Sequence, residues 1–236
     1  TDIGFAWTHS YSIEVNFTGS LPPIGGETAY LIWIDGQRIK FTYNGTHDPQ
    51  YGWRFDPPPG YHAYIYTSGG GYTLKTKDQW TYTFNADGFV TRQTDPWAND
   101  VTINRDLQNH ITTVNDGLNR SLTFAYNGTN ISSVTDPQGK VWQFERDLNN
   151  DLLKVKYPPL DSVVHETNFA YNGYHDIASY TNTLGKTWNY TYVLPEGRLA
   201  SVTNPLLRTW NVVYSANDVK IFNPYNFYVQ HNYLDG

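Results

Sequence analysis

The chain contains no cysteine and no methionine. The absence of cysteine excludes disulfides, thiolate metal sites and cysteine nucleophiles, although it does not define the redox compartment. Methionine is missing even at position 1. We therefore expect that Thr1 is not the translated start, and that the sequence follows a processing step or belongs to a longer protein.

Charge and long apolar runs are also scarce. Only 16% of the residues are charged, and 16 Lys and Arg against 22 Asp and Glu give a net charge of −6, with no basic cluster. A protein that binds nucleic acid without sequence preference needs clustered cations to displace counterions, so we expect no nucleic-acid partner. The longest apolar run, residues 29–34, is far shorter than the roughly 20 residues that span a bilayer, which predicts no membrane insertion.

The abundant residues indicate strands. Aromatic residues make up 17% of the chain, and 22 Asn, 19 Gly and 13 Pro interrupt helices and favour turns. Apolar side chains recur with period two, the pattern of a half-buried strand. Residues 31–33 and 39–43 show this alternation on either side of Asp35-Gly36, a signal for a two-residue hairpin turn. The sequence therefore predicts an all-β fold of antiparallel strands.

From about residue 81 the chain repeats. Each unit ends in a short β-branched segment followed by Asp or Asn, often with Pro next. The equivalent positions are Asp95, Asp116, Asp136, Tyr157, Asn182, Asn204 and Asn223, with spacings of 21, 20, 21, 25, 22 and 19 residues. A unit of this length holds two strands of ordinary length and two turns. We divide the chain into an N-terminal segment, 1–80, and about seven β-hairpin repeats, 81–236, whose hairpins stack into one continuous sheet that curls into a shell, tube or solenoid wall.

The repeat makes specific structural predictions. Turns are expected at residues 35–36, 85–88, 127–130, 149–151 and 195–197. The 25-residue spacing predicts a longer loop at 158–163. An equivalent place in each repeat puts four valines on one side of the sheet, where we expect them to be mostly buried. These are Val114, Val134, Val155 and Val202.

The repeat resembles the YD repeat of the RHS family. The best copy runs from Phe124 to Lys140, with Tyr126 at the Tyr position, Asn127 where the family usually has Asp, and a closing segment Val134 to Lys140. The N-terminal part is similar to the start of an RHS core at residues 7–11, 35–41, 71–74 and 82–88. The resemblance thus covers essentially the whole chain.

The resemblance implies a long antiparallel sheet that winds into a hollow shell. RHS proteins and insecticidal toxin-complex cocoons enclose a C-terminal toxin in such a shell, whereas teneurins use it in cell-surface adhesion. This chain departs from the family pattern because it has far fewer repeats. It also lacks a convincing self-cleavage segment, since Asp136-Pro137-Gln138-Gly139 lies in the middle of the array.

The candidate catalytic and metal-binding motifs each lack a required residue. His165-Glu166 begins like a zinc-protease helix, but Phe169 stands where the second His is required. Residues 147–151 spell the start of a calcium loop, but Leu152 replaces the needed Gly and Pro158 replaces the final Glu, so we interpret them as a polar turn. We therefore expect no enzyme activity, no metal and no cofactor.

The sequence offers two kinds of candidate site. Asn-x-Ser/Thr sequons, which are acceptors for glycans if the protein is secreted, occur at Asn16, Asn44, Asn119, Asn127, Asn130 and Asn189. The alternative is that these are turn-forming Asn residues beside Thr-rich strands. The last segment alternates aromatic residues and has neither Lys nor Pro to protect a strand edge. This candidate assembly edge comprises Phe227, Tyr228, Val229, His231 and Tyr233.

These observations favour a structural module of a secreted or cell-surface protein, which builds a shell wall or a self-assembling fibre or tube. Its partners would be further YD repeats or other copies of the chain. One alternative is a fragment of a toxin-encapsulating RHS shell. Another is an adhesion or carbohydrate-binding module, because Trp and Tyr faces stack on sugars; glycans would then be partners as well.

Overall fold

A computed structural model describes residue 3 and residues 7–68 and 70–232, and within them it confirms the all-β prediction. The described chain forms 21 strands and no helix, and each paired strand runs antiparallel to its neighbour. No helix in this part of the chain is long and apolar enough to cross a membrane.

The chain divides into two compact units, residues 1–141 and 142–236. This boundary differs from the division at residue 80, which marks where the repeats were predicted to start and remains a prediction. The strand bounds show why the boundary between the two compact units does not coincide with the start of the repeats. Hairpins of the repeat type already extend the first unit beyond β8 (Val90–Thr94), since β9 (Asp100–Arg105) and β10 (Ile111–Asn115) pair in order after it.

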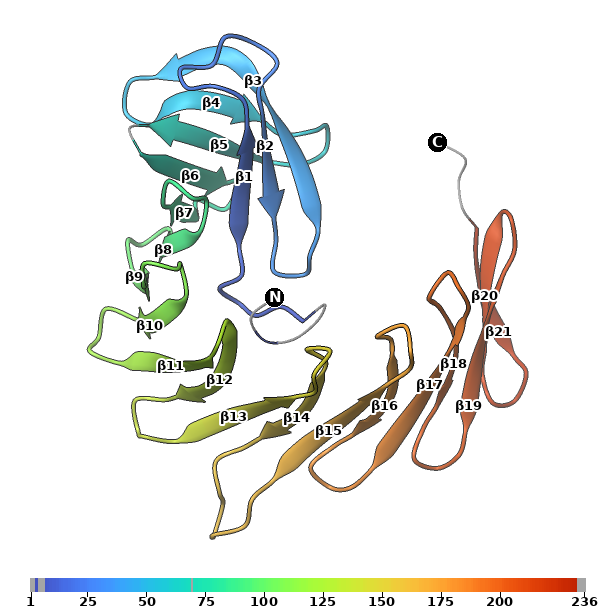
Figure 1. Ribbon diagram of the computed structural model, residues 1–236. Helices are drawn as coiled ribbons and strands as arrows, with labels where there is room; N and C mark the ends of the chain where they lie inside the picture. The colour runs from blue at the N-terminus through green and yellow to red at the C-terminus, as the bar shows by residue number, and fades with distance from the viewer. Residues whose placement is uncertain (1–2, 4–6, 69, 233–236) are drawn as a thin grey trace. The chain divides into compact units, whose positions relative to one another are not determined.

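The first unit begins with a ring of eight strands (Figure 1). Each strand pairs with the next, and an antiparallel bridge between Glu14 and Phe89 joins the first strand to the start of the eighth. The remaining bounds in this unit are β1 (Glu14–Thr18), β2 (Thr28–Ile32), β3 (Arg38–Asp48), β4 (Gly52–Asp56), β5 (Ala63–Ser68), β6 (Gly71–Thr76), β7 (Thr81–Phe84), β11 (Ser121–Asn127) and β12 (Asn130–Thr135).

The ring encloses an apolar core. Each of its eight strands contributes at least one side chain that is almost fully buried, including Val15, Leu31, Phe41, Phe55, Ile65, Leu74, Phe84 and Val90. Eight strands leave an interior just wide enough for side chains to fill. Aromatic rings complete the packing, since Phe17 meets Phe55 edge-on with ring centroids 5.8 Å apart. The apolar residues that alternate along each strand therefore point into a closed core.

The second unit is a single-layer sheet, in which each strand pairs with the next from β13 to β21. Among described residues 142–232, only Asp151, Leu152 and Thr167 are buried. The bounds are β13 (Val141–Arg146), β14 (Leu152–Lys156), β15 (Glu166–Tyr171), β16 (Ile177–Thr181), β17 (Thr187–Val193), β18 (Arg198–Thr203), β19 (Thr209–Tyr214), β20 (Asp218–Phe222) and β21 (Tyr228–Asn232).

The two faces of this second sheet differ in chemistry. The registers place aromatic and aliphatic residues opposite one another on one face, as in the row Phe169, Tyr180, Trp188, whose neighbouring ring centroids lie 5.6 and 5.5 Å apart. The other face is polar, with hydroxyl pairs such as Thr203 and Thr209 at 2.9 Å. Apolar residues therefore alternate with polar residues along these strands, and in the described part of this unit no second layer covers the apolar face.

Turns form where the sequence predicted them, with one difference. The loop at Asp35-Gly36 is five residues long, because Ile32 pairs with Arg38 and the Trp33 N–H donates to the Gln37 carbonyl. The two-residue hairpin expected there is therefore wrong. The longer loop at 158–163 is confirmed, as β14 and β15 are joined by residues 157–165.

Within each unit the valines lie on the predicted face of the sheet, but not all four are buried as predicted. The registers put Val114 and Val134 on one face within the first unit, and Val155 and Val202 on one face within the second. Val114 is buried, whereas the other three are only half-buried. For Val155 and Val202 the physical reason is that a single layer offers packing only from strand neighbours.

Candidate functional site

One five-residue turn recurs along both units. Its first residue is Asp or Asn, whose side-chain Oδ1 accepts the N–H groups of the third and fifth residues. The N–H of the first residue donates to the carbonyl of the fifth, and the fourth N–H returns to the first carbonyl. This Asx arrangement satisfies the turn backbone without a partner from elsewhere. The complete set occurs in turns that start at Asp95, Asp106, Asp136, Asp147, Asn172, Asn182, Asn204 and Asn223.

The fourth residue of each turn has a positive φ. Glycine adopts this conformation without strain, and Gly139 (79°) and Gly185 (71°) occupy the position in two turns. In other turns a larger residue stands there, including Asn109 (64°), His175 (68°) and Leu207 (58°). At Asn109 and His175 the side chain contacts the preceding turn on the same side of the sheet.

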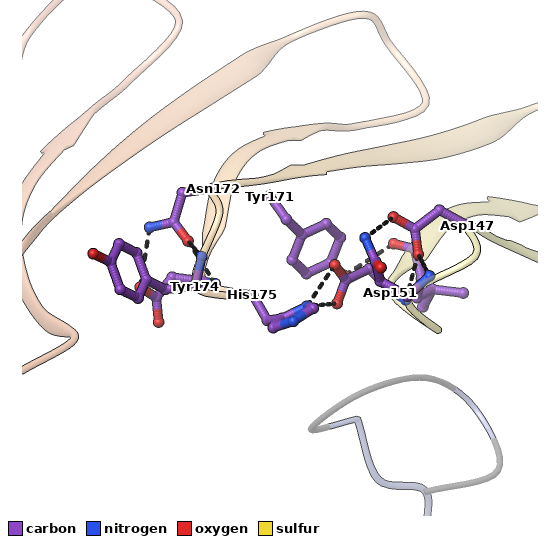
Figure 2. Close-up of polar contacts among 9 residues, drawn as sticks. Asp147, Asp151, Tyr171, Asn172, Tyr174 and His175 are labelled. Atoms are coloured by element: carbon purple, nitrogen blue, oxygen red, sulfur yellow. Dashed lines mark hydrogen bonds and ion pairs between the residues drawn. The ribbon is translucent and has the colours of Figure 1, made fainter. Parts of the chain in front are cut away.

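The His175 contact is the most enclosed polar site of the second unit (Figure 2). Its Nδ1 lies 3.0 and 2.9 Å from the two carboxylate oxygens of Asp151, the fifth residue of the turn that starts at Asp147. Asp151 is only 3% exposed. Since a carboxylate only accepts, the Nδ1 atom carries the proton and donates it. The pair therefore joins the β15–β16 turn to the β13–β14 turn.

A tyrosine reinforces the same connection. The Tyr171 hydroxyl donates to the Leu152 carbonyl at 2.9 Å, next to Asp151 (Figure 2). One hairpin later, the Tyr192 hydroxyl donates to the Ile177 carbonyl at 2.9 Å. Tyr171 is the last residue and Tyr192 the next-to-last residue of the first strand of a hairpin, and each reaches the residue that follows the preceding turn on that side. In the first unit Tyr126 holds the equivalent place and stacks on His110, with ring centroids 4.7 Å apart.

Two turn carboxylates, those of Asp95 and Asp116, have a lowered pKa. In Asp95 the side-chain amide of Asn99 and the turn N–H groups lower the carboxyl pKa below its ordinary value. In Asp116 the N–H of Leu118 and the guanidinium of Arg120 lower the pKa in the same way. Hydrogen bonds that favour the carboxylate over the acid produce this direction.

A second polar cluster lies in the first unit, at the segment that precedes strand β1. The Arg105 guanidinium donates to the carbonyls of Val90 (3.0 Å), Asn109 (2.7 Å) and Tyr11 (3.4 Å). It thereby ties the N-terminal segment and a repeat turn to β8. Beside it is a cavity of about 410 Å³, whose lining includes Glu14, Trp33 and His110.

These arrangements connect backbone segments. Within the described ranges, no group of three or more His, Cys, Asp or Glu side chains is placed to hold a metal ion. The calcium-like stretch 147–151 forms the polar turn that the sequence predicted, with the Asp147 Oδ1 accepting two backbone N–H groups. The donors and acceptors of the site therefore serve turn-to-turn contacts.

The predicted glycosylation residues differ in exposure. Asn16, Asn44, Asn119, Asn127 and Asn189 are exposed, and Asn130 is half-buried. The Asn44 side-chain nitrogen, the atom that would carry a glycan, donates to Asp56 at 2.9 Å. Their modification remains a prediction.

The predicted assembly edge lies at the last described strand. β21 pairs with β20 through Phe222↔Tyr228 and Ile221↔Val229, and all five of its residues are exposed, His231 included. Phe227, just before it, is 73% exposed. Tyr233 lies outside the described residues.

Sequence reasoning missed the residues that connect the turns. Asp151 and His175 are 24 residues apart, and Arg105 donates to Tyr11 across 94 residues. A signal was present for the first pair, because their turns start at Asp147 and Asn172, 25 residues apart, and two-strand repeats place such turns on one side. For Arg105 the sequence offers no comparable spacing.

Comparison with known proteins gives backbone likeness only. No protein-family model matches the sequence, and no curated protein matches it significantly. Among solved structures, the chain is similar to one titled TcdB2-TccC3-Cdc42, with 13% identity, a TM-score of 0.47 and coverage of 88% of this chain. It is also similar to the Photorhabdus luminescens Tc holotoxin pore, with 12% identity, a TM-score of 0.49 and coverage of 92% of this chain. The chain spans only 12% and 16% of those chains. Likeness at this level establishes neither family nor function.

Proposed function

We propose that this chain is a structural module, a wall segment of a YD-repeat shell in a secreted or cell-surface protein. The observation that carries the proposal is a one-layer sheet in residues 142–232 whose turns are tied to one another along the sheet. A sheet without a second layer cannot rely on a buried core, so local contacts must hold it. The Asx turns, the Asp151–His175 pair and the tyrosine hydroxyl bonds of Tyr171 and Tyr192 supply such contacts.

The wall would grow by strand pairing at β21. Tyr228 and Val229 are more than half exposed, and the strand from Tyr228 to Asn232 contains no Lys, Arg, Asp or Glu. An exposed, apolar strand at a sheet edge is a template for another strand. Its partner would be a further repeat or β21 of another copy. Two like edges pair about a two-fold axis, so pairing with a copy would give a dimer, because β1 is already paired with β2 and bridged to Phe89.

Light scattering and electron microscopy of the 236-residue chain test this growth. We expect concentration-dependent assembly at micromolar concentration, and its loss in Val229→Lys, because a lysine on an edge strand opposes pairing. The matched control is Val213→Lys, which also changes a half-exposed valine but lies in β19, a strand paired on both sides. Stable monomers with an ordered, unpaired β21, or equal assembly of both variants, would contradict the proposal.

A second candidate function is enclosure of a polypeptide cargo such as a toxin. The aromatic face of the second sheet favours it, because Trp188, Tyr190 and Trp210 stay half-exposed there and form a broad apolar surface. The probe is a labelled, permanently unfolded polypeptide such as carboxymethylated lactalbumin. Binding that is lost in Trp188→Ser and kept in Val213→Ser, on the opposite face, would support enclosure; equal binding by both would count against it.

A further inference from the structure

The two rims of the second sheet carry exposed apolar side chains. Consecutive antiparallel strands place alternate turns on opposite rims (Figure 1). We call the turns 147–151, 172–176, 194–197 and 215–217 the first rim, and the turns 157–165, 182–186, 204–208 and 223–227 the second rim. Large exposed residues lie in these turns: Leu148, Tyr174 and Leu194 on the first rim, and Leu160, Val163, Val164, Leu184, Leu206, Leu207, Tyr225 and Phe227 on the second.

The turn design does not demand apolar residues at these places. The Asx turn constrains its first residue, which accepts the hydrogen bonds, and its fourth, which needs a positive φ. The third residue contributes only its N–H, so Leu184 and Leu206 could be polar without loss to the turn. They are 78% and 73% exposed. Single exposed leucines are ordinary, whereas a row that repeats from turn to turn marks an interaction surface.

The period of the row narrows the choice of partner. Neighbouring turns on one rim are two strands apart, which is about 9.5 Å at the usual strand spacing. A partner that meets every apolar residue must repeat with the same period. The opposite rim of a second copy has this same period, because the turns of both rims connect the same strands.

The charges of the two rims are opposite in balance. The turns of the first rim contain Asp147, Asp151, Asp176 and Glu196 and no Lys or Arg. The residues directly flanking these turns add Arg146, Arg198 and Asp218, so the first rim remains acidic in balance. The second rim carries Lys186 and Arg208 against a single acidic residue, Asp161. Complementary charge favours contact between unlike rims over contact between like rims.

We propose that the second rim of one copy docks on the first rim of another copy, so that sheets stack rim to rim. The occupant of each rim is thus a second copy of this chain. The contact is heterologous and therefore propagates as a stack. It goes beyond the strand pairing proposed at β21 and does not require it, since rim contacts run along the strand direction and β21 pairing runs across it.

The test uses the full chain with Val229→Lys, which removes lateral pairing and leaves both rims intact. Sedimentation velocity over a concentration series reports the association. We expect Leu184→Ser with Leu206→Ser to weaken association at least about tenfold, the effect of losing roughly 1.4 kcal/mol at the contact. The matched controls are Val213→Ser on a sheet face and Ile24→Ser in a loop of the first unit, both exposed and both off the rims. Circular dichroism confirms that each variant is folded.

A charge exchange identifies which rims meet. Lys186→Glu with Arg208→Glu should weaken self-association, and mixing this variant with a Glu196→Lys chain should restore mixed association. Higher salt should weaken the wild-type contact, because exposed charges are screened. A monomeric parent chain at about 100 μM, controls as weak as the leucine variant, or no restoration on mixing would overturn the proposal. Failure of strand pairing at β21 would not contradict rim docking, since the parent chain with Val229→Lys already lacks that pairing.

Discussion

At the scale of single residues, the fourth residue of the turn determines which neighbouring segment the turn can contact. Gly88 holds this position where the ring closes, with φ of 85° and the Val15 N–H donating to its carbonyl at 2.8 Å. A Cβ atom built on Gly88 would lie 1.9 Å from the Val15 carbonyl oxygen. The glycine is therefore required by close approach of β1 as well as by its own backbone angle.

Gly88→Ala should open this closure. We expect a loss of at least about 2–3 kcal/mol in the free energy of unfolding, because backbone must move away from backbone. Gly139→Ala is the control, since it has φ of 79° in the same turn position and open space around it. Its cost should be about 1–2 kcal/mol, from the backbone angle alone. Urea unfolding measures both; equal losses would show that the contact with Val15 does not limit residue size.

Leu207 has the same backbone conformation without a glycine, with φ of 58°. Its side chain is exposed, so little packing offsets the strain. Leu207→Gly should raise the free energy of unfolding by about 1 kcal/mol, whereas Leu206→Gly, one residue earlier, should lower it by roughly 0.5–1 kcal/mol through added chain freedom. Thermal denaturation compares the two. A decrease in stability for Leu207→Gly would contradict a strained turn.

At the scale of the element, we expect the turns that start at Asp95 and Asp116 to respond to pH, because their first residue is a carboxylate with a lowered pKa, whereas a turn that starts at Asn has a neutral first residue. The folded-state pKa of Asp95 and Asp116 is lowered, by the Asn99 amide first in one case and the Leu118 N–H first in the other. A lowered folded-state pKa means that stability is complete above the unfolded pKa of about 3.9 and is lost as pH falls through the folded value. The turns at Asn182 and Asn204 have the same hydrogen bonds from a neutral side chain.

Asp95→Asn with Asp116→Asn should therefore keep both turns and reduce the acid sensitivity of the chain. We expect the double variant to lose less stability than the wild type between about pH 5 and pH 3, because two titrating groups are gone. Thermal melts across this range provide the measurement. Asn182→Asp is the reverse control, which should increase acid sensitivity. Parallel pH curves for all three chains would disprove this account of the turns.

The tyrosine hydroxyl bonds connect one hairpin to the next. Tyr171→Phe and Tyr192→Phe each leave a carbonyl of the preceding hairpin, Leu152 or Ile177, without this donor. Each should cost about 0.5–1.5 kcal/mol, the ordinary net worth of an intramolecular hydrogen bond. The exposed Tyr174→Phe is the control for loss of a hydroxyl. Chemical denaturation that failed to separate Tyr174→Phe from the other two would show that these bonds do not stabilise the sheet.

Much of this element-level structure could be predicted from the sequence. Period-two alternation identified the strands, and the Asx, Gly and Pro positions identified the turns. The 25-residue spacing identified the long loop at 158–163, which the structure has at 157–165. The spacing of the repeats also gave the direction of Val114, Val134, Val155 and Val202. These features are local, so nearby residues determine them.

The connections between elements could not be predicted. The bridge from Glu14 to Phe89 and the Arg105 contacts depend on how the ring closes, which no short pattern encodes. The spacing of their turns places Asp151 and His175 on the same side of the sheet, but no local pattern showed that these two side chains would pair. The loop at Asp35-Gly36 was misread because the dipeptide signals a turn but does not fix where the strands begin to pair.

At the scale of the whole molecule, two kinds of stability coexist in one chain. The first unit buries a side chain from every strand of its ring, whereas the described part of the second unit buries only Asp151, Leu152 and Thr167. A core of mutually contacting strands unfolds cooperatively, whereas in a stacked repeat each hairpin depends on its neighbours alone. The second unit should therefore open in steps from its end strand.

Native-state hydrogen exchange of the full chain tests this contrast. Amide protons in β2 to β7 should exchange slowest, those in β14 to β17 faster, and those in β20 and β21 fastest. Opening of core strands costs the global free energy of unfolding, while edge strands open locally for much less. Each 1.4 kcal/mol of difference appears as about a tenfold change in exchange rate. Pairing at β21 or rim docking would slow exchange in the second unit as concentration rises, and Val229→Lys would remove the part due to pairing. A uniform rate across both units at low concentration would instead mean that the single-layer sheet unfolds together with the ring, and that its turn-to-turn contacts are as strong as a buried core.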